Sequence, residues 1–325
     1  MDVWLVLLLV LAAEFVNGWT DAPNAIATVV STRVMSPQRA VLMATVLNVL
    51  GTMSGTAVAV TIGTGIVDPK VINLVTVAAA MVGIVSWSTL AWYYGLPTSE
   101  SHALVAGLAG AGLAVAGPDA LLWDGWRKVF IGLGFSSFLG FGAGLLLISA
   151  LYHMLVHSTP GMVRSLFGRL QIFSAAFMAF SHGSNDGQKF MGAFSLALVL
   201  GGLLPEFRIP FWVILLCATA MGVGTAFGGW RIIKTMGIQM TKLEPVHGFA
   251  AETSAALVIE AASRLGIPLS TTHTISTAIM GVGASRRFSA VRWGIVAEIV
   301  TAWILTFPVC ALIGWLVATA LRSLS

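Results

Sequence analysis

The segment GWTDAPNAIATVVSTR, residues 18 to 33, places an acid, a proline and an amide in a strongly apolar part of the chain. If this segment lies in a bilayer, Asp21 costs about 2.5–3.5 kcal/mol on insertion scales. Carboxylate and amide oxygens are ligands that hard cations prefer. Asp21 and Asn24 are therefore candidate ligands for a cation at membrane depth.

A second polar stretch, SHGSNDGQKFMG at 181 to 192, aligns with the first at an offset of 165. Asp21 then meets Asp186, and Asn24 meets Lys189. Carboxylates repel oxyanions, so we assign the acids and their neighbouring amides to a cation: Asp21, Asn24, Asn185 and Asp186. Gln188 and Lys189 are assigned to an anion bound beside that cation, although Lys189 could instead neutralise Asp186.

Two further segments, GLPTSESHA at 95 to 103 and GIPLSTTHT at 266 to 274, align at an offset of 171. Proline suits the first turn of a helix, so we predict that a helix begins at Pro97 and another at Pro268. Hydroxyls and free N–H groups at the positive end of a helix dipole bind oxyanions. The candidate anion ligands are the hydroxyl residues of these turns: Thr98, Ser99, Ser101, Ser270, Thr271 and Thr272.

Several other polar residues lie in or near these segments. Glu100, His102 and His273 are additional candidates for the site, and each histidine either contacts the substrate or braces its hairpin. Glu252, beside two hydroxyl residues, is a candidate cation or proton site. The remaining acids of the apolar segments are expected near helix ends: Glu14, Glu260 and Glu298.

The composition identifies the elements that must position these residues. The chain of 325 residues is 57% hydrophobic and 9% charged, with a mean hydropathy of +0.92. An average soluble domain is about 25% charged, so the chain is an integral, multi-pass, all-α membrane protein. We retain the first 18 residues as a membrane helix, because Asp2 stands where a signal peptide carries a basic residue.

Apolar runs predict ten to twelve membrane-embedded helical segments. Four runs reach the roughly 20 residues that span a bilayer: 40–66, 74–94, 129–156 and 295–321. Others are shorter or interrupted by glycine, and we expect broken or re-entrant helices among them: 103–117, 190–204, 211–229, 249–263 and 274–284.

The two alignments divide the chain into halves of similar plan. We predict an N-terminal repeat at 1–157, a linker loop at 158–170 and a C-terminal repeat at 171–325. Repeats with polar interruptions at matching positions commonly flank the substrate site of secondary transporters. The spacing alone leaves open whether the repeats are parallel or inverted.

Other classes of protein find little support. The net charge of +4 comes from scattered basic residues without interleaved aromatics, so we expect no nucleic-acid partner. Cys217 and Cys310 lie in apolar segments and give no disulfide framework. The sequence contains no HExxH, GxSxG or GxxxxGK[ST] motif, which disfavours an intramembrane enzyme.

The four polar segments resemble the paired signatures of the inorganic phosphate transporter (PiT) family, and the likeness spans both halves. The resemblance implies an inverted-repeat fold whose helical hairpins meet at the centre, with cation-coupled phosphate uptake across the cytoplasmic (inner) membrane, often as a homodimer. It implies no cofactor beyond a coupling ion, Na+ or H+, and it places phosphate on the hydroxyl residues named above. Thr20 and Pro23 depart from the family pattern, where many members have an asparagine and a small residue.

These observations give one leading hypothesis, a phosphate symporter that works by alternating access with sodium or protons as the coupling ion. A transporter of another oxyanion such as sulfate is the nearest alternative, because hydroxyls and helix dipoles bind both anions. A passive channel and an intramembrane enzyme are weaker alternatives. The expected partners are inorganic phosphate and the lipid bilayer.

Overall fold

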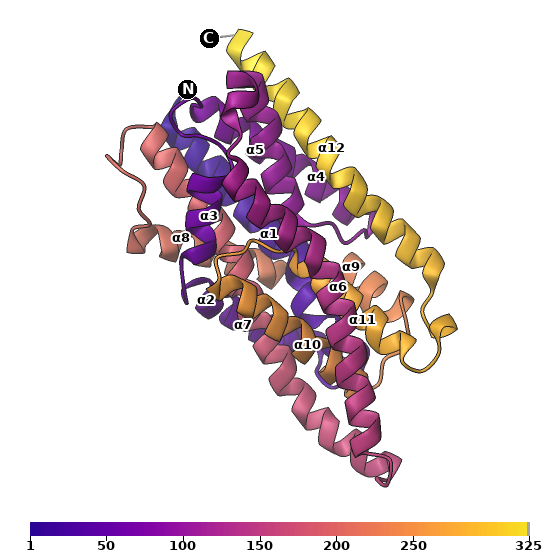
Figure 1. The fold of residues 1–325 in the computed structure, drawn as a ribbon. Helices are drawn as coiled ribbons and strands as arrows, with labels where there is room; N and C mark the ends of the chain where they lie inside the picture. Colours follow the sequence, from indigo (N-terminus) through magenta and orange to yellow (C-terminus); the bar gives the residue numbers. More distant parts are fainter. Residues whose placement is uncertain (324–325) are drawn as a thin grey trace.

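The computed structural model describes residues 1–323 and contains twelve α-helices in that part of the chain (Figure 1). The first half comprises α1 (Val3–Ser31), α2 (Pro37–Thr52), α3 (Ala57–Gly65), α4 (Leu74–Tyr94), α5 (Glu100–Ala116) and α6 (Trp123–Met154). The second half comprises α7 (Pro160–Leu200), α8 (Phe211–Phe227), α9 (Trp230–Lys234), α10 (Pro245–Arg264), α11 (Thr271–Ala284) and α12 (Trp293–Ser323). The all-helical prediction is confirmed.

Five of these helices are long and apolar enough to cross a membrane, and the number rises to seven if each of two bent pairs is one span. One bent pair corrects the sequence prediction, because the run 40–66 is divided into α2 and α3, which meet at 67°. Ser54 and Gly55 lie in the break, where residues that favour turns replace good helix formers. The second pair, α8 followed by α9 and its π-helical extension, bends by 60°.

Two helical hairpins enter the molecule from opposite ends (Figure 1). α4 runs inward from the end that holds both chain termini and α5 returns to it, whereas α10 and α11 do the same from the other end. Gly95 and Gly266 end the inward helices at matched positions, with φ of 72° and 65°. Glycine adopts this left-handed conformation without steric cost, so the two hairpins turn in the same way.

The two halves interlock. α12 packs against α5 of the first hairpin, and α6 packs against α11 of the second; α1 similarly contacts α8, and α7 contacts α2. A Cβ on Gly18 would overlap the backbone oxygen of Met221, and one on Gly183 would overlap that of Asn48. Matched glycines therefore allow the same close helix approach in both halves.

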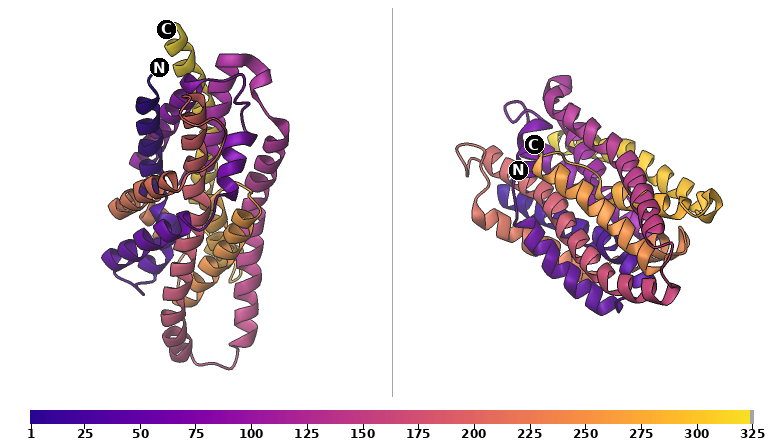
Figure 2. Two further views of the ribbon diagram at one scale, coloured as in Figure 1. Left: turned by 90° about the vertical axis from the view of Figure 1, so that its left-hand side faces the viewer. Right: turned by 60° about the horizontal axis from the view of Figure 1, so that its bottom comes forward.

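The predicted linker loop at 158–170 is wrong over most of its length. α7 begins at Pro160, so residues 160–170 are helical and only a short turn joins α6 to α7 (Figure 2). The side chain of Thr159 caps the helix by accepting a hydrogen bond from the backbone N–H of Met162. Threonine followed by proline is a helix-start signal, and it outweighs the nearby glycine.

Candidate functional site

The return helices of the two hairpins begin three residues later than predicted, at Glu100 and Thr271. The preceding residue, Ser99 or Ser270, is the N-cap in each case. Its hydroxyl accepts a hydrogen bond from the backbone N–H three residues further on, at 3.3 Å in the first hairpin and 3.2 Å in the second. A capping serine fixes the start of a helix, so the two prolines lie in the approach to it.

The two hairpin tips touch each other at the centre of the molecule. The hydroxyl of Ser101 donates a hydrogen bond to the backbone oxygen of Leu269 at 2.7 Å. Lys189, from α7, donates to both of these groups, with its ammonium 3.0 Å from the Leu269 oxygen. The lysine side chain is fully buried, so the tips share one buried positive charge.

Asp186 is the acid of the second half, and its carboxylate lies beside three polar side chains. It forms a buried ion pair with Lys189. Its Oδ2 accepts a hydrogen bond from the hydroxyl of Thr271 at 2.8 Å, and Nε2 of His182 lies 3.5 Å from the same oxygen. The structure thus brings a predicted cation ligand and a predicted anion ligand into direct contact.

Asp21, the matched acid of the first half, has a different environment. The hydroxyl of Thr272 lies 3.4 and 3.3 Å from its two carboxylate oxygens. The side-chain amide of Asn24 donates to the same hydroxyl at 3.0 Å, which completes a short hydrogen-bonded chain. Within residues 1–323, no basic side chain forms an ion pair with Asp21.

Glu100 is a third buried acid at the tips. One of its oxygens lies 3.0 Å from the hydroxyl of Thr20, and the other accepts from Ser88 at 2.9 Å. Of these three buried carboxylates, Asp186 forms an ion pair with Lys189, whereas Asp21 and Glu100 form none within residues 1–323, which leaves a formal excess of two negative charges when all are ionised. Burying uncompensated charge in a low dielectric is costly, so this cluster favours cations or protons.

A cation could be held where the two halves meet. Ligand atoms of Asp21, His182 and Asp186 lie within 4.8 Å of one another, and all three residues are buried. His182 was not among the predicted ligands, although its spacing of four residues from Asp186 places both side chains on one helix face. Carboxylates and hydroxyls suit a hard cation better than the imidazole does.

Three predicted ligands, Gln188, Asn185 and Thr98, lie outside the cluster of carboxylates and hydroxyls at the hairpin tips. The side-chain oxygen of Gln188 accepts from the backbone N–H of Val58 at 3.0 Å, so Gln188 caps α3. The amide of Asn185 donates to the hydroxyl of Ser263 at 3.0 Å, near the end of α10. Thr98 is buried in the approach to α5. In the described part of the chain, neither amide side chain bonds a tip hydroxyl or one of the three carboxylates.

Glu252 belongs to a separate buried cluster. Its carboxylate accepts hydrogen bonds from Thr28, Gln171 and Ser174, with the amide of Gln171 at 3.1 Å. Thr28 lies seven residues beyond Asp21 on α1, so the two acids are separated by about 10 Å along that helix. The predicted set of cation ligands therefore divides into two groups.

The histidines at the tips pack against each other and against α12. The rings of His102 and His273 are 4.5 Å apart, and His273 stacks on Trp303 at 3.7 Å. Both rings line a cavity of about 320 Å³ with Phe307. No hydrogen bond joins either ring to the three carboxylates within residues 1–323, so these contacts favour the bracing role.

Glu14 corrects another expectation. It lies in the middle of α1 and is fully buried, not near a helix end. One carboxylate oxygen accepts from the amide of Asn17 at 3.0 Å, and the other has no hydrogen-bond partner among the described residues. The Glu-x-x-Asn spacing places both side chains on one helix face, which was the signal for a buried pair.

Comparisons with known proteins give the family of the chain. The model of the "Phosphate transporter family" matches residues 17–314, which include both hairpins and both acidic segments. The chain belongs to this family. Phosphate is the substrate of the family, and its relatives are named as transporters, not enzymes.

Relatives of this phosphate transporter family member match it along nearly its whole length. A Rhizobium meliloti protein named "Probable low-affinity inorganic phosphate transporter" is 48% identical over 303 residues, or 93% of this chain and 91% of the relative. A Bacillus subtilis protein of the same name is 41% identical over 322 residues, or 97% of each. A solved structure named "The sodium-dependent phosphate transporter" has a TM-score of 0.91 at 24% identity and full coverage of both chains, which confirms the fold.

Proposed function

We propose that this protein is a cation-coupled symporter of inorganic phosphate that works by alternating access. One observation carries the proposal: the tip hydroxyls suited to an anion also contact the acids suited to a cation. Thr272 bonds Asp21, and Thr271 bonds Asp186. An anion and a cation bound on the two sides of these hydroxyls would each offset the field of the other.

Phosphate is favoured over sulfate by the acids at the tips. Near neutral pH phosphate retains a protonated oxygen, which can donate a hydrogen bond, whereas sulfate has no such donor. Asp21 and Glu100 are acceptors beside the hydroxyl residues, and Lys189 supplies a positive charge. We assign Thr98, Ser99, Ser101, Ser270, Thr271 and Thr272 to the phosphate site, together with Lys189; Gln188, on α7, supports the site by capping α3.

The coupling ion is assigned to Asp21, Asn24 and Asp186, with Asn185 as a neighbouring support. Because Lys189 already neutralises Asp186, the unpaired carboxylate of Asp21 is the main attraction for the ion. Either Na+ or H+ satisfies this requirement, and the name of the solved relative supports sodium. Glu252 is a second, separate site for a cation or proton.

The inverted hairpins support alternating access. One opens toward each end of the molecule, and their tips share the central site (Figure 1). Rocking of one repeat against the other would expose that site to the two sides in turn. The family resemblance and the apolar helices support a location in the cytoplasmic membrane, and the resemblance supports a homodimer.

Uptake of labelled phosphate into proteoliposomes tests this function. Parallel samples carry an inward sodium gradient, an inward proton gradient or no gradient. We expect uptake above the gradient-free level in one of the first two samples. If an active preparation shows equal uptake in all three, coupled symport is wrong.

Competition separates phosphate from the alternative substrate. Unlabelled phosphate should suppress uptake of the label at concentrations where unlabelled sulfate has little effect. Equal suppression by the two anions would show a general oxyanion transporter. The second acidic cluster is tested in the gradient-driven uptake assay with Glu252→Gln. Its control is Glu206→Gln, which changes an exposed acid. A cation or proton site at Glu252 predicts lower uptake in the first variant only.

A further inference from the structure

A strongly basic cavity lies at the end of the molecule where the second hairpin opens. It has a volume of about 330 Å³ and is bounded by residues 241–243, the end of α11 and the loop that leads to α12. Four cationic side chains line it: Lys242, Arg286, Arg287 and Arg292. Only Arg286 has an acidic partner, Glu244 at 2.8 Å; the other three have none within residues 1–323.

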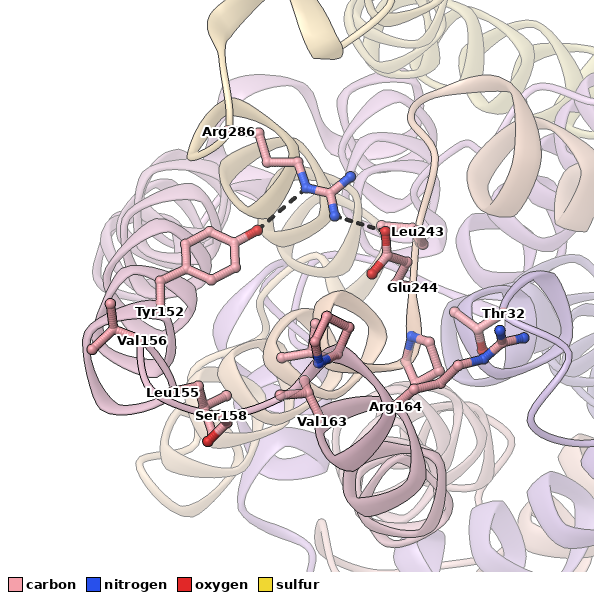
Figure 3. Close-up of a pocket in the computed structure, with 13 residues that line it drawn as sticks. Thr32, Tyr152, Leu155, Val156, Ser158, Val163, Arg164, Leu243, Glu244 and Arg286 are labelled. Atoms are coloured by element: carbon pink, nitrogen blue, oxygen red, sulfur yellow. Dashed lines mark hydrogen bonds and ion pairs between the residues drawn. The ribbon is translucent and has the colours of Figure 1, made fainter.

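A second cavity of about 700 Å³ adjoins the first and shares Arg286 with it. Figure 3 shows this guanidinium held between the hydroxyl of Tyr152 and the carboxylate of Glu244, at 3.4 and 2.8 Å. Arg164 lines the larger cavity. These two hydrogen bonds fix the side chain of Arg286 in the wall between the two cavities. Together the two cavities are lined by five cationic side chains and one acidic side chain, that of Glu244.

Like charges repel, so positive side chains that converge on one concave surface are stabilised by a bound anion. Arginine and lysine are the side chains that bind phosphate groups, arginine through two parallel hydrogen bonds. Beside the basic cavity, Phe288 and Trp293 are 66% and 37% exposed, and their rings stack at 4.3 Å. Exposed aromatic rings are enriched at the headgroup level of a membrane.

We propose that the basic cavity is a binding site for a phosphate group, distinct from the central transport site. The group belongs either to inorganic phosphate or to the headgroup of an anionic phospholipid, which have this chemistry in common. α11 separates the two sites, because its 14 residues extend about 20 Å from Thr271 at the tip to Ala284 beside the cavity. The cavity thus lies at the base of the hairpin that forms half of the central site.

Protection of an introduced thiol tests this proposal. Ser289 lines the cavity and is exposed, whereas the natural Cys217 and Cys310 are buried, so Ser289→Cys gives one reactive position. The rate of maleimide labelling is measured in phosphatidylcholine nanodiscs, with or without inorganic phosphate. A second comparison, in the absence of free phosphate, measures the rate in nanodiscs with and without phosphatidylglycerol. We expect labelling to slow by about fivefold when the site is nearly saturated.

The two arms identify the source of the phosphate group. Slower labelling with inorganic phosphate assigns a free-phosphate site, and slower labelling with phosphatidylglycerol assigns a lipid site; either result supports the proposal. Neutralisation of the cavity, with Lys242, Arg287 and Arg292 all changed to Gln, should abolish protection. The matched control changes Arg127, Lys128 and Arg208 to Gln, which removes three exposed charges elsewhere and should leave protection intact.

Three results would overturn the proposal: unchanged labelling in both arms, equal protection after the cavity is neutralised, or loss of protection in a variant of the central site. Thr272→Val, in the central site, separates this question from the transport function. Protection that persists in Thr272→Val shows a site independent of transport, as we expect. Protection that disappears in that variant would show that the effect comes from the central site instead.

Discussion

The acids of the two halves occupy matched positions but have opposite surroundings. Asp186 on α7 is paired with Lys189, whereas the position that matches Lys189 in the first half is Asn24, and Asp21 has no cationic partner within residues 1–323. The second hairpin likewise begins with Thr271 where the first begins with Glu100. The backbones of the two halves match while their charges differ, so one half carries its own counter-ion and the acid of the other half has none within residues 1–323.

The largest effect should come from removing the internal counter-ion. Lys189→Met leaves Asp186 buried and unpaired, which should destabilise the protein by about 3–5 kcal/mol. Thermal unfolding of the purified protein measures this loss. The double variant Lys189→Met with Asp186→Asn removes both charges and should recover most of the stability. If the double variant is no more stable than Lys189→Met, the ion pair is not the cause.

Removal of the unpaired acid should affect transport more than folding. Asp21→Asn keeps the shape and the bond to Thr272, yet it removes the charge that we propose attracts the coupling ion. We expect gradient-driven phosphate uptake to fall on the order of 100-fold, near the upper range of coupling between sites. Asp119→Asn, an exposed acid outside the site, is the matched control. Full uptake by Asp21→Asn would remove this residue from the coupling site.

The hydroxyls at matched tip positions should separate the roles of the two halves. Thr272→Val removes a hydroxyl oxygen that could bind sodium beside Asp21, so with sodium as the coupling ion the concentration needed for half-maximal uptake should rise about tenfold. Ser101 bonds Lys189 and Leu269 instead. Ser101→Ala should therefore leave the ion requirement nearly unchanged. Equal shifts in the two variants would mean that the halves contribute alike to ion binding.

The smallest effect should come from the first residues of the inward helices. Asn73 caps α4, and the matched cap of α10 is Glu244. A hydrogen bond from Arg286 lowers the pKa of Glu244 below its ordinary value of 4.5. Its stabilising contribution is therefore present above that value and is lost as the pH falls through the lowered pKa of the folded state.

Hydrogen exchange at the first turns of α10 and α4 measures this difference. After correction for intrinsic exchange rates, acidification to pH 3 should increase exchange at α10 relative to α4. Glu244→Gln should remove this change. The same acid response with and without the carboxyl group would show that another group is responsible.

Local sequence patterns predicted the paired segments well, because a glycine turn, a capping hydroxyl and a proline act over a few residues. The same patterns placed the helix starts at Pro97 and Pro268, whereas the stronger signal was the serine two residues further on. Contacts between segments that are distant in the sequence were harder to predict. The burial of Glu14, the hydrogen bond from α3 to Gln188 and the separation of Glu252 from Asp21 all depend on how helices pack, and the spacing of residues along the chain does not show this packing.

The exchange of packing partners between the halves has a consequence for the origin of the chain. Each hairpin is covered by the last helix of the other half, α12 on α5 and α6 on α11, so a repeat on its own would leave its hairpin without that cover. An ancestor with one repeat would have needed a second copy in the opposite orientation to bury the same surface. Fusion of two such copies would then have preserved an existing assembly, which makes the two repeats a permanent antiparallel dimer within one polypeptide.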